Sequence, residues 1–167
     1  MDSFNPYLAG FFDGDGSLHF QIVRSDVYRF GFYLRSSLVF YQSTSAAAGL
    51  LEIQRRTGGR MRERGTMSDL TITQRSTIRS VLLDMRPYVI FKRAQVDSGL
   101  ELLDHLSPPR DPRGFLKVCV TIDEFASLNF SKSRTNTSET VREHFESMGL
   151  LVPVTTDPQG SAQLSIF

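Results

Sequence analysis

Two aspartates near the N-terminus, Asp13 and Asp15, are the residues whose type and spacing point most directly to chemistry. They lie in the run LAGFFDGDGS, residues 8–17, where a glycine follows each aspartate. Asn5 and Pro6 precede the run and predict a helix start, with Asn5 as the N-cap and Pro6 at the first helical position. We expect this helix to run through about Asp13 and to end at the glycines. Carboxylates at that end lie against the negative pole of the helix dipole, so they favour a bound cation.

The glycines of this predicted helix offer a surface on which a second helix can pack closely. Gly10 and Gly14 are four residues apart, as are Ala9 and Asp13, so each pair shares a face. If the second helix belongs to another copy of the chain, the two Asp15 carboxylates converge and repel each other unless a cation intervenes. Oxygen ligands of this kind suit Mg²⁺. We therefore predict a homodimer with these four residues at its interface and Mg²⁺ beside Asp15.

Two alternatives exist for the DGDG segment, residues 13–16. A calcium loop of the form D-x-D-x-[DN]-G would need glycine at its sixth position and glutamate at its twelfth, where this chain has Leu18 and Arg24. That alternative fails. A glycine-rich turn that only leads into a hairpin stays open when the segment is considered alone.

The composition is that of one ordinary globular domain, with 167 residues, 40% hydrophobic residues and a formal net charge of +1. We expect a domain over residues 1–150 and a tail over residues 151–167. The charge is unevenly distributed, because residues 54–93 carry ten Lys or Arg against three Asp or Glu. Such a segment favours a polyanionic partner, although a solvated surface has the same pattern. The single Cys119 excludes an internal disulfide, and no apolar run reaches membrane-spanning length, so no membrane partner is expected.

Apolar periodicity predicts the elements that position these residues. After the first helix we expect strands at 17–24 and 33–42, a helix at 44–56 capped by Thr44 or Ser45, and strands at 60–64 and 68–73. Helices follow at 76–85, 92–105, 115–129 and from Asn136 to Gly149, the last with Glu139 as capping-box partner. This order predicts an α+β fold in which helices pack on one side of an antiparallel sheet.

The other side of the predicted sheet carries mainly polar side chains, several of which end in an amide, carboxylate or guanidinium group. Alternation places Leu18, Phe20 and Ile22 on the helix side of the first strand and polar residues opposite. Such hydrogen-bonding groups fit base edges and phosphates in a wide DNA groove, although a simply solvated face is the alternative. The residues of this polar face are His19, Gln21, Tyr33, Arg35, Arg60, Arg62, Arg64, Asp69 and Thr71.

The run LAGFFDGDGS closely resembles the signature of the LAGLIDADG homing endonucleases. Residues 62–72 (RERGTMSDLTI) and 115–142 (FLKVCVTIDEFASLNFSKSRTNTSETVR) also resemble parts of the single-motif branch of that family, so the similarity covers about residues 7–148. The resemblance implies an αββαββα fold with a saddle-shaped antiparallel sheet, a homodimer, and dependence on Mg²⁺ without a small-molecule cofactor. It implies cutting of both strands of a long pseudo-palindromic DNA site to leave short 3′ overhangs. It also implies an intron-encoded protein that promotes intron homing in an organelle, with the chloroplast favoured over the mitochondrion.

The resemblance implies roles for individual residues. Asp15 matches the metal-binding acid of the motif, and Gly14 matches the position whose backbone carbonyl approaches the metal. Gln42 matches a glutamine that orients solvent near the attacking water, and Lys92 matches a lysine near the scissile phosphate. Asp15, Gln42 and Lys92 are thus the implied catalytic residues, whereas a structural role is expected for Asp13.

Ten residues fall on family positions that contact DNA, and arginine with guanine is the pairing we expect most. They are Gln21, Arg24, Tyr28, Tyr33, Arg35, Arg62, Arg64, Asp69, Thr71 and the phosphate-contacting Lys132. One position departs from the family pattern, because Ala46 stands where relatives often carry a basic residue. Two alternatives stay open. One is an RNA-splicing maturase or a DNA-binding derivative that no longer cuts, and the other is a small domain that only dimerises.

Overall fold

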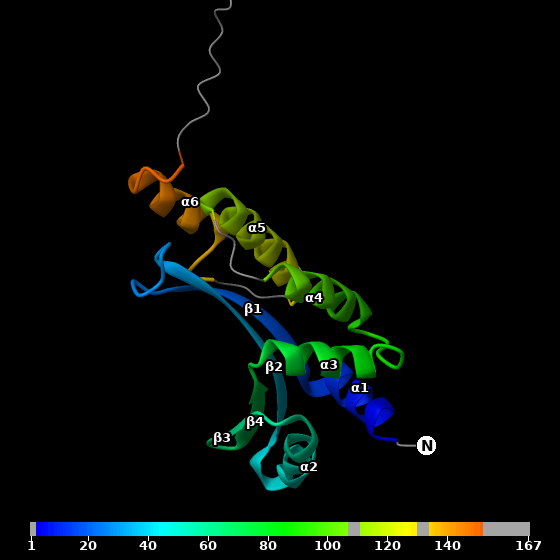
Figure 1. Cartoon of the computed structure of the whole chain (residues 1–167). Helices are drawn as coiled ribbons and strands as arrows, with labels where there is room; N and C mark the ends of the chain where they lie inside the picture. Colours follow the sequence, from blue (N-terminus) through cyan, green and yellow to red (C-terminus); the bar gives the residue numbers. More distant parts are fainter. Residues whose placement is uncertain (1–2, 107–110, 130–133, 152–167) are drawn as a thin grey trace, which may run out of the picture.

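The computed structural model describes residues 3–106, 111–129 and 134–151. The expected α+β architecture is confirmed, because α1 to α3 follow the αββαββα order and α4 to α6 add further helices (Figure 1). None of the helices in this part of the chain is long and apolar enough to cross a membrane. All but the first residue of the predicted tail lies outside the described residues. The elements are α1 (Phe4–Asp15), β1 (Gly16–Arg24), β2 (Phe32–Ser43), the 3₁₀ turn η1 (Thr44–Ala46), α2 (Ala48–Thr57), β3 (Arg60–Arg64), β4 (Met67–Ile72), α3 (Arg75–Met85), α4 (Arg93–His105), α5 (Pro112–Leu128) and α6 (Ser138–Ser147).

Four antiparallel strands form one sheet in the order β1–β2–β4–β3. The register pairs Gly16 with Phe40 between β1 and β2, and Tyr41 with Asp69 between β2 and β4. Figure 1 shows α4, α5 and α6 beside the long β1–β2 pair and α2 beside β3 and β4. Helices therefore cover one face of the sheet and leave the other open.

The core lies between the covered face of the sheet and the helices. Leu18, Phe20 and Ile22 of β1 are at most 5% exposed, as the alternation predicted. Phe12 of α1 is fully buried and packs edge-to-face on Phe40 of β2, with ring centroids 6.3 Å apart. Because burial of one such side chain stabilises the fold by about 1.5–3 kcal/mol, α1 is held firmly against its own subunit along this face.

α1 is longer than predicted at both ends. It begins directly after Ser3, its N-cap, so the prediction of Asn5 as the cap is wrong. It continues through Asp15 and ends where the N–H of Gly16 donates to the carbonyl of Phe12. A Cβ on Gly16 would lie 2.4 Å from Phe12 Cδ2 and 2.7 Å from Phe12 Cα, so close approach of backbone requires glycine here.

The predicted helix over residues 44–56 is split into η1 and α2. Ala47 is the N-cap of α2, so the predicted cap at Thr44 or Ser45 is wrong. The hydroxyl of Thr44 instead donates to the carbonyl of Gly65 in the β3–β4 turn, at 3.2 Å. A tertiary hydrogen bond to this turn thus replaces the local cap.

The start of α6 also differs from the prediction. Thr137 is its N-cap and forms a capping box with Thr140, so the predicted box of Asn136 and Glu139 is wrong. Asn136 instead donates to the carbonyl of Ile22 at 3.1 Å. Because β1 is an edge strand, this side chain satisfies an acceptor that would otherwise face outward.

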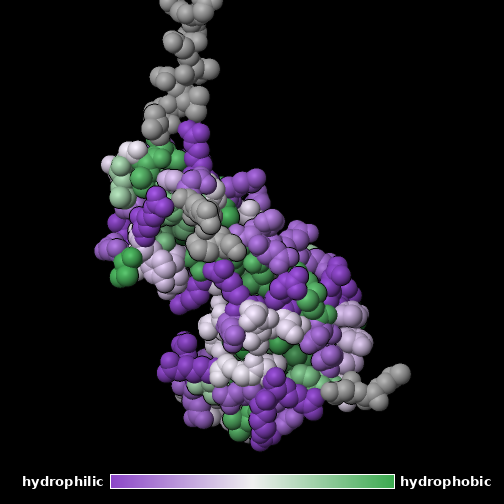
Figure 2. All heavy atoms as spheres, in the orientation of Figure 1, coloured by the Kyte–Doolittle hydropathy of each residue, from purple (hydrophilic) through white to green (hydrophobic). Residues whose placement is uncertain are grey.

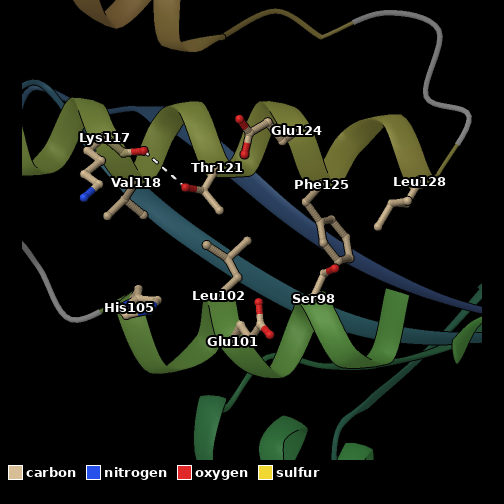
Figure 3. Close-up of a pocket in the computed structure, with 10 residues that line it drawn as sticks. All are labelled: Ser98, Glu101, Leu102, His105, Lys117, Val118, Thr121, Glu124, Phe125 and Leu128. Atoms are coloured by element: carbon tan, nitrogen blue, oxygen red, sulfur yellow. Dashed lines mark hydrogen bonds between the residues drawn. The ribbon is translucent and has the colours of Figure 1, made fainter. Parts of the chain in front are cut away.

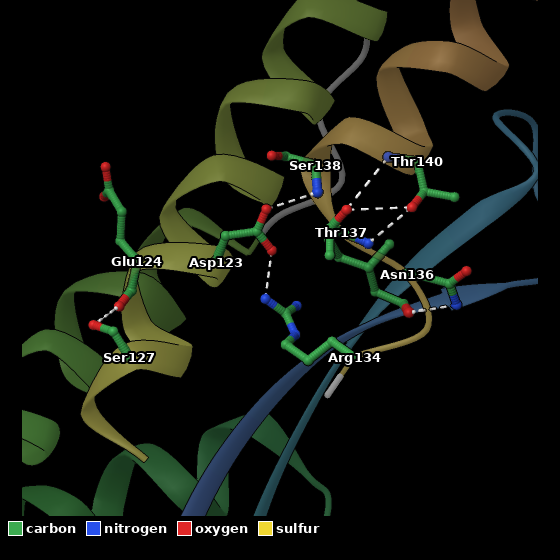
Figure 4. A network of polar contacts seen from close by, with 9 residues as sticks. Asp123, Glu124, Ser127, Arg134, Asn136, Thr137, Ser138 and Thr140 are labelled. Atoms are coloured by element: carbon green, nitrogen blue, oxygen red, sulfur yellow. Dashed lines mark hydrogen bonds and ion pairs between the residues drawn. The ribbon is translucent and has the colours of Figure 1, made fainter. Parts of the chain in front are cut away.

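A polar network joins α5 to the start of α6 (Figure 4). Asp123 of α5 forms an ion pair with Arg134 and accepts a hydrogen bond of 2.7 Å from the N–H of Ser138. Asn129, at the end of α5, donates to the carbonyl of Leu18 at 2.6 Å. Asn129 and Asn136 therefore both donate to carbonyl groups of the edge strand β1.

Candidate active site

Asp13 anchors a distant loop to the carbonyl end of α1. Its carboxylate accepts hydrogen bonds from the backbone N–H groups of Ile90, Phe91 and Lys92, at 2.7, 3.2 and 2.9 Å. These three residues directly precede α4, so one carboxylate satisfies the donors at the entry to that helix. The geometry agrees with the structural role expected of Asp13, while its contact with a second copy stays a prediction.

Lys92 lies at the same end of α1. Its Nζ donates to the carbonyl oxygens of Phe12 and Gly16, at 2.8 and 2.6 Å. Partial burial lowers the pKa of the Lys92 ammonium group, and the negative charges of Asp13 and Asp15 act against this shift. Tertiary packing thus places a cation beside an acidic helix end that is far from it in the sequence.

Asp15 is the exposed last residue of α1. Gly14 belongs to the same final turn, in which backbone carbonyl groups have no donor within the helix. Carboxylate and carbonyl oxygens are the ligands that Mg²⁺ takes, usually in small number and together with water or phosphate oxygens. Asp15 and Gly14 therefore fit such an ion. Among the described residues, no group of three or more His, Cys, Asp or Glu side chains is placed to hold a metal.

Gln42 lies near the end of β2, on the face of the sheet that packs against α1. It follows Phe40 by two positions, so the two side chains share a face, about 7 Å apart along the strand. Phe40 pairs with Gly16, the residue directly after Asp15. The Oε1 of Gln42 accepts a hydrogen bond of 2.8 Å from the N–H of Ser43. The register therefore brings Gln42 to the acidic end of α1.

The open face of the sheet forms a groove of about 550 Å³. Figure 2 shows the molecule hollowed on its left side, with hydrophilic side chains along the border. Six residues predicted to contact DNA line the groove, namely Gln21, Arg35, Arg62, Arg64, Asp69 and Thr71. The residues that the site prediction missed include Ser37, Val39, Tyr41 and Met67. The first three share the alternation of β2, which is a signal that could have found them.

Asp69 is a buried carboxylate of this groove that contacts two neighbouring polar side chains. It is 6% exposed, accepts a hydrogen bond of 2.9 Å from the Thr71 hydroxyl, and pairs with Arg64 at 3.4 Å. Tyr41 lies opposite it in the register. Burial and the charge of Asp69 raise the pKa of Tyr41, and Arg64 lowers it. Tyr41 therefore keeps its hydroxyl proton at neutral pH and can donate a hydrogen bond.

The remaining residues predicted to contact DNA lie elsewhere. Tyr28 and Tyr33 stack at the hairpin end of β1 and β2, with ring centroids 4.8 Å apart. The Arg24 guanidinium lies 5.7 Å from the ring centroid of Phe32, near the same hairpin. Tyr33 shares the open face with Arg35, whereas alternation places Arg24 on the side of β1 that carries Ile22, so the DNA contact of Arg24 stays a prediction. Lys132 lies outside the described residues, so its phosphate contact stays a prediction.

Three of the described residues of α1 that bear on the predicted dimer are exposed, and a fourth is buried. Gly10 and Gly14 are exposed, and a Cβ on either would meet no atom within 4 Å. Tyr7 is also 57% exposed. Ala9 is fully buried among core side chains of its own subunit, and its predicted contact with a second copy stays a prediction. Ala9 is three residues before Phe12 and so lies on the same side of the helix.

A second hollow, of about 620 Å³, lies between α4 and α5 (Figure 3). Ser98, Leu102 and His105 line it from α4, and Val118 and Phe125 line it from α5. None of the residues predicted to bind metal or DNA lines this hollow. It belongs to the helical layer and is separate from the candidate site.

Comparison with known proteins decides the family. A family model described as LAGLIDADG endonuclease matches residues 8–88. The DNA endonuclease I-CreI of Chlamydomonas reinhardtii is 35% identical over 144 residues, which cover 85% of this chain and 88% of that protein. The chain belongs to the LAGLIDADG endonuclease family. A second member, the DNA endonuclease I-CvuI of Chlorella vulgaris, is 33% identical over 148 residues, covering 87% of this chain and 92% of that protein.

The family's structures agree with this assignment. The crystal structure of I-CvuI in complex with its target, in the presence of calcium, matches with a TM-score of 0.82 and 32% identity. The match covers 89% of this chain and 96% of that chain. The α+β homing-endonuclease fold and the resemblance to the single-motif branch of the family are therefore confirmed.

Proposed function

We propose that the protein is a homing endonuclease that cuts both strands of a specific double-stranded DNA site. Two observations carry the proposal: Lys92 lies at the carbonyl end of α1 near Asp15, and the open face of the sheet forms a groove lined by several arginines. A groove lined by several arginines suits DNA binding, and an exposed carboxylate near a cation suits phosphodiester hydrolysis. The naming of I-CreI and I-CvuI as DNA endonucleases supports the same conclusion.

Asp15, Gln42 and Lys92 each have a distinct part in the proposed reaction. Asp15, with the carbonyl of Gly14, binds Mg²⁺, which supplies charge stabilisation at the phosphate and a more acidic water. Gln42 orients the attacking water through its side-chain amide. Lys92 places positive charge near the phosphate, where negative charge develops in the transition state. Structures of I-CvuI with calcium and with magnesium support the choice of a divalent ion.

The proposed active form is a homodimer, with one α1 from each copy at the twofold axis. Gly10 and Gly14 leave the outward face of α1 bare, which lets two helices approach closely. Beside it, Ile90 and Phe91 are 75% and 85% exposed although both are apolar. Burial of these side chains against a second copy would stabilise a dimer. Twofold symmetry then matches a pseudo-palindromic site, with one half-site for each subunit.

The wider role follows from the family. We propose that the gene lies in a mobile intron, and that staggered cuts with short 3′ overhangs in alleles lacking the intron promote its homing. The relatives from Chlamydomonas and Chlorella support an organellar location, with the chloroplast favoured.

Selection from a randomised duplex library tests the proposal. Wild-type protein is incubated with the library in Mg²⁺ or in Ca²⁺, and bound and cut molecules are sequenced. We expect one family of sequences to be bound in both ions and cut in Mg²⁺. Asp15→Asn should bind the same sequences without cutting them, whereas Asp84→Asn, at an exposed position on α3, should cut like wild type. Binding in both ions with cutting in neither rejects the nuclease.

A DNA-binding derivative that does not cut is the second candidate, and Ala46 favours it. Ala46 is exposed in η1, close in sequence to Gln42, and its methyl group supplies neither charge nor a hydrogen bond. If this candidate is right, wild type binds without cutting and Ala46→Arg restores cutting in Mg²⁺.

A further inference from the structure

Gln21 and Arg35 form a hydrogen-bonded pair on the open face of the sheet. They are direct partners in the β1–β2 register, and both side chains are exposed. The Oε1 atom of Gln21 accepts hydrogen bonds from Nε and from one Nη atom of Arg35, at 3.0 and 2.5 Å. The amide oxygen of Gln21 must face Arg35, because the amide nitrogen carries N–H donors and the guanidinium offers no acceptor for them.

This pairing changes the hydrogen-bonding character of Gln21. A free glutamine offers an acceptor and a donor side by side, which matches the N6 donor and N7 acceptor of adenine in the major groove. Here the acceptor is already occupied by Arg35. What stays available is the Nε2 amide of Gln21 and three of the five guanidinium N–H groups of Arg35, so the pair presents donors only.

The N–H donors of this pair are available to an acceptor on a bound ligand. Asp69 is the acidic side chain among the residues that line the groove, and it is engaged by Arg64 and Thr71. Guanine presents two acceptors, O6 and N7, in the major groove, whereas adenine presents one acceptor and one donor. A donor-only pair therefore matches guanine and leaves the adenine N6 donor facing another donor.

We infer that Gln21 and Arg35 act as one recognition unit that selects guanine at a single position of each half-site. The inference rests on the proposed function, because it concerns the DNA that the groove binds. Arg35 prevents Gln21 from selecting adenine. Removal of Arg35 should therefore convert this position from guanine to adenine, rather than only weaken binding.

Binding selection in Ca²⁺ with the full chain and a randomised duplex library tests the pair. Wild type should require guanine at one symmetric position, by roughly tenfold to hundredfold over adenine. Arg35→Ala should prefer adenine at that position, because Oε1 and Nε2 of Gln21 are then both free. Gln21→Ala should keep guanine with weaker discrimination, since Arg35 loses its anchor. Arg62→Ala, on β3, is the matched control and should leave this position unchanged.

The outcomes separate the pair from the proposed function. If wild type enriches a site but Arg35→Ala keeps guanine at every position, or loses preference without gaining adenine, the pair is refuted while the DNA-binding function stands. If wild type enriches no sequence at all, the proposed function fails and the inference fails with it. Circular dichroism of each variant establishes that a changed preference does not reflect unfolding.

Discussion

The backbone N–H of Lys92 donates a hydrogen bond of 2.9 Å to the carboxylate of Asp13, and this contact fixes the entry to α4 on the end of α1. The side chain of the same lysine reaches the carbonyl oxygens of Phe12 and Gly16. Lys92 therefore joins the framework of the fold to the candidate active site. Substitutions at Asp13 and Lys92 should separate these two roles.

Asp13→Ala should destabilise the protein. Three backbone N–H groups lose a charged acceptor, and such a loss costs about 1–3 kcal/mol in the free energy of unfolding. Urea unfolding followed by circular dichroism measures this change. Asp84→Ala is the matched control, since Asp84 is an exposed carboxylate on α3, and it should change stability by less than about 0.5 kcal/mol. Equal stability of the two variants would show that the Asp13 contacts contribute little.

Lys92→Met should reduce cutting strongly while leaving DNA binding in place. Removal of one group that stabilises transition-state charge costs about 10²–10³-fold in rate. The control is Lys117→Met on α5, an exposed lysine of the helical layer. Single-turnover cleavage of the selected site in Mg²⁺ measures the effect, and unimpaired cutting by Lys92→Met would remove this residue from the site.

Cutting should also fall at alkaline pH. Burial lowers the pKa of Lys92 from its ordinary 10.5, so its positive charge is lost at a lower pH than that of a solvated lysine. The contribution of Lys92 to the stability of the fold changes in the opposite direction and becomes more favourable as pH rises. Because the unfolded state holds the proton more tightly, the cost of burying the charge declines as pH rises through the lowered pKa towards 10.5. A comparison of wild type with Lys92→Met across this range isolates the contribution of Lys92 to stability.

Gly16→Ala and Gly10→Ala should change stability in opposite directions. The new methyl group at position 16 meets the backbone of Phe12, and such overpacking costs about 1–3 kcal/mol. The methyl group at position 10 meets no atom of its own subunit, and replacing a helical glycine by alanine stabilises by about 0.5–1 kcal/mol. In the proposed dimer, Gly10→Ala should nevertheless weaken association, which analytical ultracentrifugation measures. A Gly10→Ala variant that dimerises like wild type would argue against this interface.

Cys119 should be inert in the native protein. Burial, and to a smaller extent the charge of Asp123, raises the pKa of its thiol to about 12. Since the thiolate is the reactive form, a disulfide reagent at pH 8 should label the urea-unfolded protein and leave the folded protein unlabelled. The unfolded thiol ionises near 9.0, before the folded one, so its contribution to stability declines as pH rises above that value. Cys119→Ala should lack this decline, and rapid labelling of the native protein would contradict the burial of the thiol.

The sequence predicted the strands and their faces well because the signal is local. In β1, alternate residues are apolar, and Leu18, Phe20 and Ile22 are buried as predicted. Helix ends were harder, since a polar side chain near a terminus can bond elsewhere. Asn136 is a good local cap, yet its side chain donates to β1, and Thr44 donates to the β3–β4 turn.

The sequence by itself determined the family, the layered fold and the acidic, glycine-rich end of the first helix, because these depend on residue types at short spacings. Only the tertiary structure decided that the Lys92 side chain donates to a carbonyl group at the end of that helix and that Ala9 is buried. It also decided that Arg35 donates to the amide oxygen of Gln21. The physical reason is that each of these relations joins or orients side chains through packing between elements. Local periodicity specifies which side of an element is apolar, whereas the partner that a polar group finds depends on how distant elements come together.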